Sequence, residues 1–187
     1  DGANDGGSGV GVLLEMARQF SLKEPTLGVD IIFFDAEDYG TFNGSMQSME
    51  DDWCLGSQYW GKNPPIPNYN PRFGILLDMV GEKNAQFPQE GFSVYFAQNI
   101  VDKVWNTARK LGYSNYFITK RIGQITDDHR YVNILANIPS IDIIGYNTQT
   151  NSFGGYHHTH KDNMDIIDKN TLKAVGQTVM EVVYQER

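Results

Sequence analysis

The sequence predicts an α/β domain in which helices flank a central, largely parallel β-sheet. Segments with a helical spacing of apolar residues alternate with short segments that are apolar throughout, as in parallel strands buried on both faces. The chain has 187 residues, of which 40% are hydrophobic and 20% charged. This length suits one domain with a substantial core, and the apolar fraction excludes a disordered chain.

The expected elements follow one another in a regular order. Helical spacing predicts a first helix over Val10–Phe20, and the apolar run Val29–Phe34 predicts a strand buried on both faces. A polar loop follows over 41–52. The further elements expected in order are a helix near 56–60, a loop over 63–71, a strand at 74–81, a helix at 100–111, a strand at 116–118, a helix at 127–135, a strand at 140–144 and a helix at 171–184.

Charge and cysteine content narrow the possible partners. Lysine and arginine total 15 against 23 aspartates and glutamates, a formal net charge of -8, and such a surface repels the phosphates of nucleic acid. No apolar run approaches the ~18–20 residues of a membrane helix, so no membrane span is expected. The single cysteine, Cys54, allows no internal disulfide, and we expect a packing residue whose thiol pKa is raised by Asp51 and Asp52.

The chain opens on a glycine-rich segment, Asp1–Gly9, which is unlike the bland, frayed start of a mature protein. It is typical of the middle of a domain, so we expect residues upstream of Asp1. The segment lacks both the Gly-Lys-Ser/Thr ending of a P-loop and the spaced glycines of a dinucleotide fingerprint. A phosphate-binding role is therefore excluded.

Polar residues gather where the predicted strands end, which is where parallel α/β sheets bind ligands. A catalytic zinc site needs about three nitrogen or oxygen ligands and one open position. Asp5, a carboxylate of Glu37 or Asp38, and one late histidine would supply such a set. Carboxylates at strand ends also commonly cap helices or are simply solvated, so a structural role for each of these residues remains an alternative. The clustered residues are Asp5, Asp35, Glu37, Asp38, Asp78, Asp127, Asp128, His129, His157, His158 and His160.

Five segments resemble the M28-type zinc aminopeptidases and their relatives, the glutaminyl cyclases. Residues 2–10 resemble the Gly-Ala-x-Asp-x-x-Ser-Gly segment of these enzymes, and residues 33–38 resemble their paired-acid motif. Residues 77–81 and 127–129 also match, as does His158-Thr159 with Asp162 behind it. The matches occur in family order over residues 2–163, and together they are specific.

The resemblance implies a three-layer sandwich, in which helices flank a central mixed, largely parallel twisted sheet, as in zinc exopeptidases. Residues 1–187 would then form a single domain of this kind that lacks its N-terminal strands. The resemblance also suggests a bacterial exported enzyme, periplasmic or secreted, although no signal peptide is visible in the sequence.

The resemblance further implies roles for individual residues. Asp5, Asp38 and His158 would be zinc ligands, with Asp38 a departure because the family usually has Glu there. Glu37 would be the general acid/base. Asp78 would bind a second zinc in an aminopeptidase but would be a hydrogen-bonded acid in a cyclase.

Two features of the sequence resemble glutaminyl cyclases more than aminopeptidases. The insert between Asp38 and Gly56 is long, and Asp127 doubles the acid before His129, so that it would complete an acid network with Glu37 and Asp78. Such clustering would raise at least one carboxyl pKa. Phe153 falls where cyclases have a substrate-pocket aromatic, whereas His157 replaces the Trp of vertebrate-type cyclases.

We therefore expect zinc-dependent cyclisation of the N-terminal glutamine of peptides or proteins to pyroglutamate, with release of ammonia. This reaction needs one zinc ion, because no water nucleophile is required. An M28-type aminopeptidase with two zinc ions, and an inactive binding domain on the same scaffold, are the alternatives.

Overall fold

The computed structural model describes residues 2–40 and 52–187. Helices and strands alternate through much of the chain, as the sequence predicted. The helices are α1 (Gly7–Leu22), α3 (Leu55–Lys62), α4 (Gly91–Lys110), α5 (Asp128–Ala136) and α6 (Lys169–Gln185), with short 3-10 turns η1 (Glu37–Tyr39) and η2 (Met164–Ile166). The strands are β1 (Gly74–Asp78), β2 (Phe87–Gln89), β3 (Phe117–Arg121) and β4 (Ser140–Ile144).

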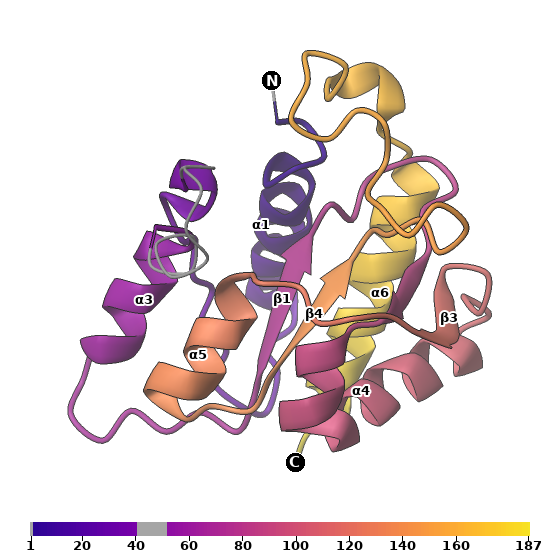
Figure 1. Cartoon of the computed structure of the whole chain (residues 1–187). Coiled ribbons are helices and arrows are strands. Elements are labelled where there is room, and N and C mark those ends of the chain that lie inside the picture. The colour runs from indigo at the N-terminus through magenta and orange to yellow at the C-terminus, as the bar shows by residue number, and fades with distance from the viewer. Residues whose placement is uncertain (1, 41–51) are drawn as a thin grey trace.

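The strands pair in parallel, which confirms the predicted α/β class. β1 pairs with β4 in a register that sets Leu76 opposite Asp142, and β2 pairs with β3. Helices α1 and α6 pack on one another behind β1 and β4, while α5 covers their front (Figure 1). Every residue of β4 is buried, so this strand lies at the centre of the core.

Helix α4 begins nine residues before the predicted helix at 100–111, and its cap explains where it starts. The Glu90 carboxylate accepts hydrogen bonds from the backbone N–H groups of Phe92 and Ser93, both at 2.7 Å. Ala97 interrupts the helix with a φ of -144°. Apolar residues recur at helical spacing only after this kink, so the sequence predicted only the part of the helix from residue 100 onward.

The prediction of a strand buried on both faces at Val29–Phe34 is wrong. No strand of the described residues pairs with this segment, and Val29 and Phe33 are 37% and 51% exposed. A strand needs a neighbouring backbone to complete its ladder. The backbone across from this segment is β1, which pairs with β4 on one edge and faces a cavity on the other.

Smaller differences have local causes. β1 stops at Asp78 because Met79 takes a left-handed conformation, with a φ of 48°. β2 was not predicted, since three residues that include a proline carry no measurable period. β3 runs on to Arg121, and the predicted polar loop falls almost wholly on residues 41–51, outside those described. In the described residues, no helix is both long and apolar enough to cross a membrane.

Candidate functional site

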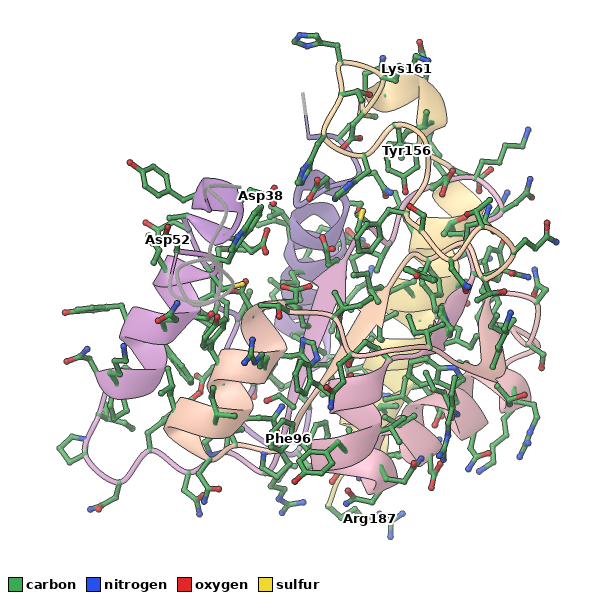
Figure 2. All side chains as sticks on the ribbon, in the orientation of Figure 1. Asp38, Asp52, Phe96, Tyr156, Lys161 and Arg187 are labelled. Atoms are coloured by element: carbon green, nitrogen blue, oxygen red, sulfur yellow. The ribbon has the colours of Figure 1, made fainter. Side chains whose placement is uncertain are left out.

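The predicted site residues come together at the carboxyl end of β1 and β4. The loop before α1, the turn η1, the end of β1 and the loop before η2 all meet there (Figure 1). In Figure 2, Asp38 and Tyr156 mark this end of the molecule, whereas Phe96 and Arg187 mark the opposite end. The site is therefore assembled from segments that lie more than 150 residues apart in sequence.

Asp162 joins the first and last of these segments. Its carboxylate is buried and accepts from the backbone N–H of Asn4 at 2.7 Å and of Asp5 at 3.0 Å. The Asn4 side chain accepts from the N–H of Gly81 and donates to the Tyr156 hydroxyl. Sequence reasoning gave Asp162 no role, and the one available signal was its place behind the His158-Thr159 motif.

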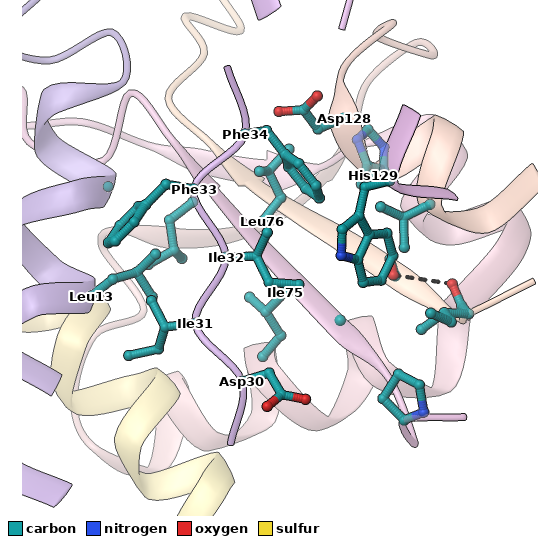
Figure 3. Close-up of a pocket in the computed structure, with 18 of the residues that line it drawn as sticks. Leu13, Asp30, Ile31, Ile32, Phe33, Phe34, Ile75, Leu76, Asp128 and His129 are labelled. Atoms are coloured by element: carbon teal, nitrogen blue, oxygen red, sulfur yellow. Dashed lines mark hydrogen bonds between the residues drawn. The ribbon is translucent and has the colours of Figure 1, made fainter. Parts of the chain in front are cut away.

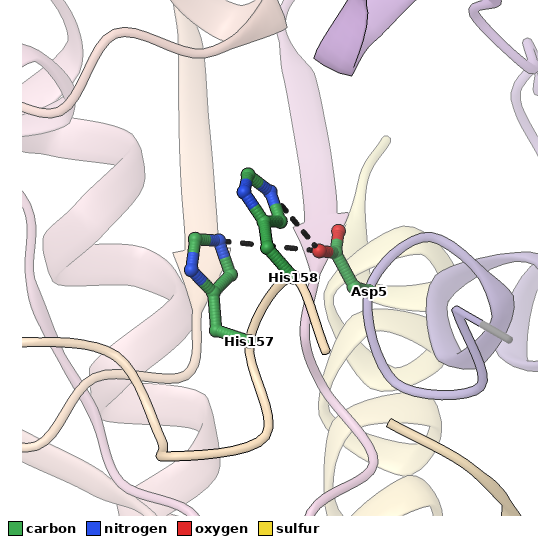
Figure 4. A group of neighbouring side chains, drawn as sticks. All are labelled: Asp5, His157 and His158. Atoms are coloured by element: carbon green, nitrogen blue, oxygen red, sulfur yellow. Dashed lines mark ion pairs between the residues drawn. The ribbon is translucent and has the colours of Figure 1, made fainter. Parts of the chain in front are cut away.

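Asp5 and Asp38 both approach the imidazole of His158. His158 Nε2 lies 3.1 Å from Asp38 Oδ1 and 3.6 Å from Asp5 Oδ2. Figure 4 shows His158 and His157 turned toward Asp5, and His157 Nε2 lies 3.9 Å from the same Asp5 oxygen. Asp5, Asp38 and His158 also line a cavity of about 340 Å³.

The donor set fits a zinc ion, because two carboxylates and an imidazole are ligand types that zinc prefers. Burial and the charge of Asp38 raise the pKa of Asp5 to about 6, although His158 acts in the opposite direction. A bound cation would relieve this repulsion between neighbouring carboxylates. His157, whose role the sequence left open, offers a further imidazole within 4.8 Å of the Asp5 and His158 ligand atoms.

A second group of acids, Glu37, Asp78 and Asp127, lies beside the first. Burial, then the charges of Asp38 and Asp78, raise the pKa of Glu37 to about 9. Burial and the charges of Asp5 and Asp38 raise that of Asp78 to about 8. Burial and neighbouring carboxylates raise the pKa of Asp127 well above its ordinary value. The expected effect of clustering is thus present at all three residues.

Asp78 differs from Asp5 in its surroundings. Among the described residues, the group at this site whose atoms could share a cation contains Asp5, His157 and His158 but neither Asp78 nor Asp38, and Asp38 contacts this group through His158. The Asp78 carboxylate instead accepts hydrogen bonds from the backbone N–H groups of Met79 and Gly6. This is the arrangement of a hydrogen-bonded acid.

The first turn of α3 fixes the backbone that carries Glu37. The N–H groups of Cys54, Leu55 and Gly56 donate to the carbonyls of residues 37, 36 and 35 in turn. The buried Cys54 thiol lies 3.4 Å from Glu37 Oε1. Burial raises the thiol pKa, aided by Asp127, Asp128 and Glu37 rather than by Asp52 as the sequence suggested, and Asp51 lies outside the described residues.

Phe153 reaches the site through His157. The two rings lie 4.5 Å apart, and His157 stacks on His158 at 3.7 Å. Phe153 lines neither of the two cavities described here. The structure therefore places Phe153 beside the stacked His157 and His158 rings.

A larger apolar cavity of about 840 Å³ opens beside the acids. Figure 3 shows Ile32 turned toward Ile75 and Leu76 of β1, whereas Ile31 and Phe33 lie on the other side of their chain segment, toward Leu13. The same cavity reaches the acid group. It separates two extended stretches of backbone.

Fold and site together define an α/β domain with a cluster of carboxylates and imidazoles at the carboxyl end of a parallel sheet. The sequence matches the profile of Peptidase family M28 over residues 1–183. The chain belongs to peptidase family M28.

Solved structures of both cyclases and exopeptidases resemble the chain. A glutaminyl cyclase from Bacteroides thetaiotaomicron, crystallised with N-acetylhistamine, is 57% identical with a TM-score of 0.95. A Zn-dependent exopeptidase from Parabacteroides distasonis is 58% identical with a TM-score of 0.94. Each match covers 100% of this chain and 64% of the other protein.

Aminopeptidase YwaD of Bacillus subtilis is a more distant relative. It is 27% identical over 190 residues, which cover 98% of this chain and 37% of that protein. The chain thus spans less than two thirds of the length of the relatives that it matches.

We predict that Asp78→Asn changes how stability depends on pH in metal-free protein. A folded-state pKa of about 8 means that the folded state retains a proton that the unfolded chain loses near pH 4. The contribution of Asp78 therefore favours folding at low pH and is lost as pH rises through about 8. The variant should gain stability relative to the parent between pH 5 and pH 8.

Urea unfolding with a chelator present would measure this difference. Asp165→Asn, at an exposed position, is the matched control and should show no such gain. If the free energies of unfolding of Asp78→Asn and the parent differ by the same amount at pH 5 and at pH 8, the raised pKa of Asp78 is contradicted.

Proposed function

We propose that the protein is a zinc-dependent glutaminyl cyclase, which converts the N-terminal glutamine of a peptide or protein to pyroglutamate and ammonia. Membership of family M28 and the 57% identity to a glutaminyl cyclase support the proposal. The observation that carries it is Asp78, which is bound to backbone N–H groups and does not join Asp5, His157 and His158 in the group of atoms that could share a cation. A site with two metal ions would need this carboxylate as a ligand.

Asp5, Asp38 and His158 would hold one zinc ion. When bound, the ion supplies a Lewis acid for the side-chain amide oxygen of the substrate. Asp38 is shorter than the Glu usual in the family, but its Oδ1 already reaches to 3.1 Å from His158 Nε2. This approach supports Asp38 as a ligand in spite of its shorter side chain.

The proton transfers fall to Glu37. The α-amine of the substrate, with a reference pKa of about 7.7–8.0, loses a proton as its nitrogen bonds to the side-chain amide carbon. Glu37 takes this proton and returns it to the departing nitrogen, so that the C–N bond of the amide breaks and ammonia leaves. Glu37 must be ionised to take this proton, and a carboxylate whose pKa lies near 9 in the metal-free protein is a strong enough base to hold it.

Asp78 and Asp127 support this exchange, because their carboxyl groups lie close to Glu37 and compete with it for protons. A pocket that folds the glutamine back on itself would add the advantage of proximity. We assign Phe153 to that pocket, because its ring contacts His157 beside the proposed zinc ligand His158. Export from the cytoplasm forms part of the same proposal and rests on the family resemblance.

An aminopeptidase is the second candidate, and the similarity to a Zn-dependent exopeptidase and to YwaD favours it. Such an enzyme would activate water with two metal ions instead of using the substrate amine. An inactive binding domain is the third candidate, but the raised pKa of Glu37 beside a convergent ligand set is typical of a catalytic site.

The first test compares two substrates. We expect ammonia from a Gln-initiated peptide and no amine from a Leu-initiated amide, because the reaction needs the side-chain amide of glutamine. Coupled ammonia detection and a fluorogenic leucine amide would measure both. Leucine release without ammonia would support the aminopeptidase instead, and neither product, even with zinc supplied, would support a binding domain.

The second test separates proton transfer from zinc binding. Glu37→Gln should lower kcat by about 100-fold or more, as for loss of a general acid/base, and keep zinc. His158→Ala should lose zinc affinity. Metal content by atomic absorption and kcat would be measured for both variants, with His160→Ala as the control. Equal metal loss in the Glu37 and His158 variants would contradict these roles.

We also propose that residues 1–187 belong to one domain whose sheet contains a further strand. The unpaired edge of β1 and the extended segment 28–34 face the same apolar cavity. Parallel strands are normally buried and paired on both sides. The relatives are longer than this chain. A strand from another part of the full-length protein would pair with β1 on one side and with the segment 28–34 on the other.

Amide hydrogen exchange in the full-length protein would test this strand. The amides of residues 30–34 should exchange as slowly as those of β4, because both would lie inside a ladder. Exchange as fast as that of the proline-rich loop 63–71 would mean that the cavity stays open.

A further inference from the structure

One buried acid has no role in the mechanism proposed above. Asp142 lies at the centre of β4 and is fully buried. Among residues 2–40 and 52–187, no donor forms a hydrogen bond with either oxygen of its carboxyl group. A buried polar group without a partner is strongly unfavourable, so this carboxyl requires a physical explanation.

Behind Asp142 lies a hydrogen-bonded pair. His129 Nε2 lies 2.9 Å from Oε2 of Glu90, the residue that caps α4. Burial opposes the charge of Glu90, but hydrogen bonds from His129, Ser93 and Phe92 outweigh it and hold the pKa at about 2. Because an ionised carboxylate only accepts hydrogen bonds, Nε2 of His129 must donate to it. The imidazole is thereby fixed in orientation.

The other ring nitrogen of His129 points toward Asp142. Nδ1 lies 4.0 Å from Asp142 Oδ2 and has no hydrogen-bond partner among the described residues. Asp127, His129 and Asp142 each offer an atom within 4.8 Å of the others. Asp142 is thus enclosed by one imidazole and one carboxyl group.

Asp127 stands between Asp142 and the proposed proton carrier. It caps α5, and its Oδ1 accepts from the N–H of Asp128 at 2.6 Å. It also shares a second group with Glu37 and Cys54, again with atoms within 4.8 Å of one another. Burial raises the pKa of both Asp127 and Asp142, the charge of Asp142 raises that of Asp127 further, and a side-chain hydrogen bond with Asp127 acts to lower that of Asp142.

We propose that Asp142 is a positioning residue for Asp127: the two carboxyl groups share a proton, backed by the Glu90–His129 pair, and this holds Asp127 toward Glu37. Two carboxylates cannot bond to each other, but a carboxylic acid donates to a carboxylate, which accounts for the missing partner of Asp142. The inference rests on the proposed cyclisation, in which Glu37 carries the proton, and deepens it.

Two substitutions at Asp142 test the shared proton. Asp142→Asn keeps a donor of the same shape, whereas Asp142→Leu removes the donor together with the buried acid. Replacing buried charged groups by apolar ones is often neutral or stabilising, so the leucine variant should fold. Ile143→Val, in the same buried strand, is the matched control.

The two variants should behave differently. With a Gln-initiated peptide, Asp142→Asn should keep kcat within about threefold, while Asp142→Leu should lower it by about 10- to 100-fold, as for other supporting residues of catalytic sites. KM should stay within about twofold and the zinc content should not change, because Asp142 touches neither substrate nor the proposed ligands. Tm values would establish that both variants are folded.

Three results would overturn the inference. These are an unchanged kcat in the folded leucine variant, equal losses in both variants, and loss of one metal equivalent, which would make Asp127, His129 and Asp142 a cation site. Asp142→Ala takes the place of the leucine variant if that protein does not fold.

Failure of the proposed function would look different. A parent protein that releases no ammonia contradicts cyclisation whatever the variants do. Crystal structures would then still decide the inference. The Asp127 carboxyl should keep its orientation in the asparagine variant and turn away from Glu37 in the apolar variant, and an unmoved Asp127 in the apolar variant would overturn it.

Discussion

The buried carboxylate of Asp162 is the constraint on which the site depends. It accepts from the backbone N–H groups of Asn4 and Asp5, so it fixes the main chain from which the Asp5 side chain projects. The same loop carries His158, only four residues earlier in the sequence. One carboxylate therefore holds together two segments from opposite ends of the chain, which carry Asp5 and His158. The parallel sheet supplies the common edge, but this contact aligns the loops above it.

The carboxyl end of the sheet carries more acidic side chains than the fold requires for its stability. Asp5 and Asp38 repel each other in front, and Glu37, Asp78 and Asp127 do so behind. Such a cluster is stable only when a cation or retained protons neutralise it. The front group has an imidazole and opens to a cavity, whereas the rear group is more deeply buried. The two groups therefore suit different chemistry, cation binding in front and proton storage behind.

Sequence reasoning predicted the elements whose signal is local. The strand at 140–144 and the helices α1, α5 and α6 were predicted from the spacing of their apolar residues. The ends of the helices differ from the prediction by a few residues, because capping contacts determine where a helix begins and ends. Val29–Phe34 failed because a strand requires a partner that no local pattern reveals. The motifs placed Asp5, Asp38 and His158 together, but they could not reveal Asp162 as an anchor or Asp142 as an unpaired acid. Both depend on contacts between distant segments.

The left-handed residues at the site have a consequence for sequence variation. Met79 follows Asp78 with a φ of 48°, and His158 has a φ of 55°. Branching at Cβ strongly disfavours this conformation, whereas glycine and asparagine tolerate it. Mutational libraries that aim to alter specificity would therefore lose most valine, isoleucine and threonine members at these two positions. Diversity is better directed to neighbours such as His157, whose backbone is not in that region.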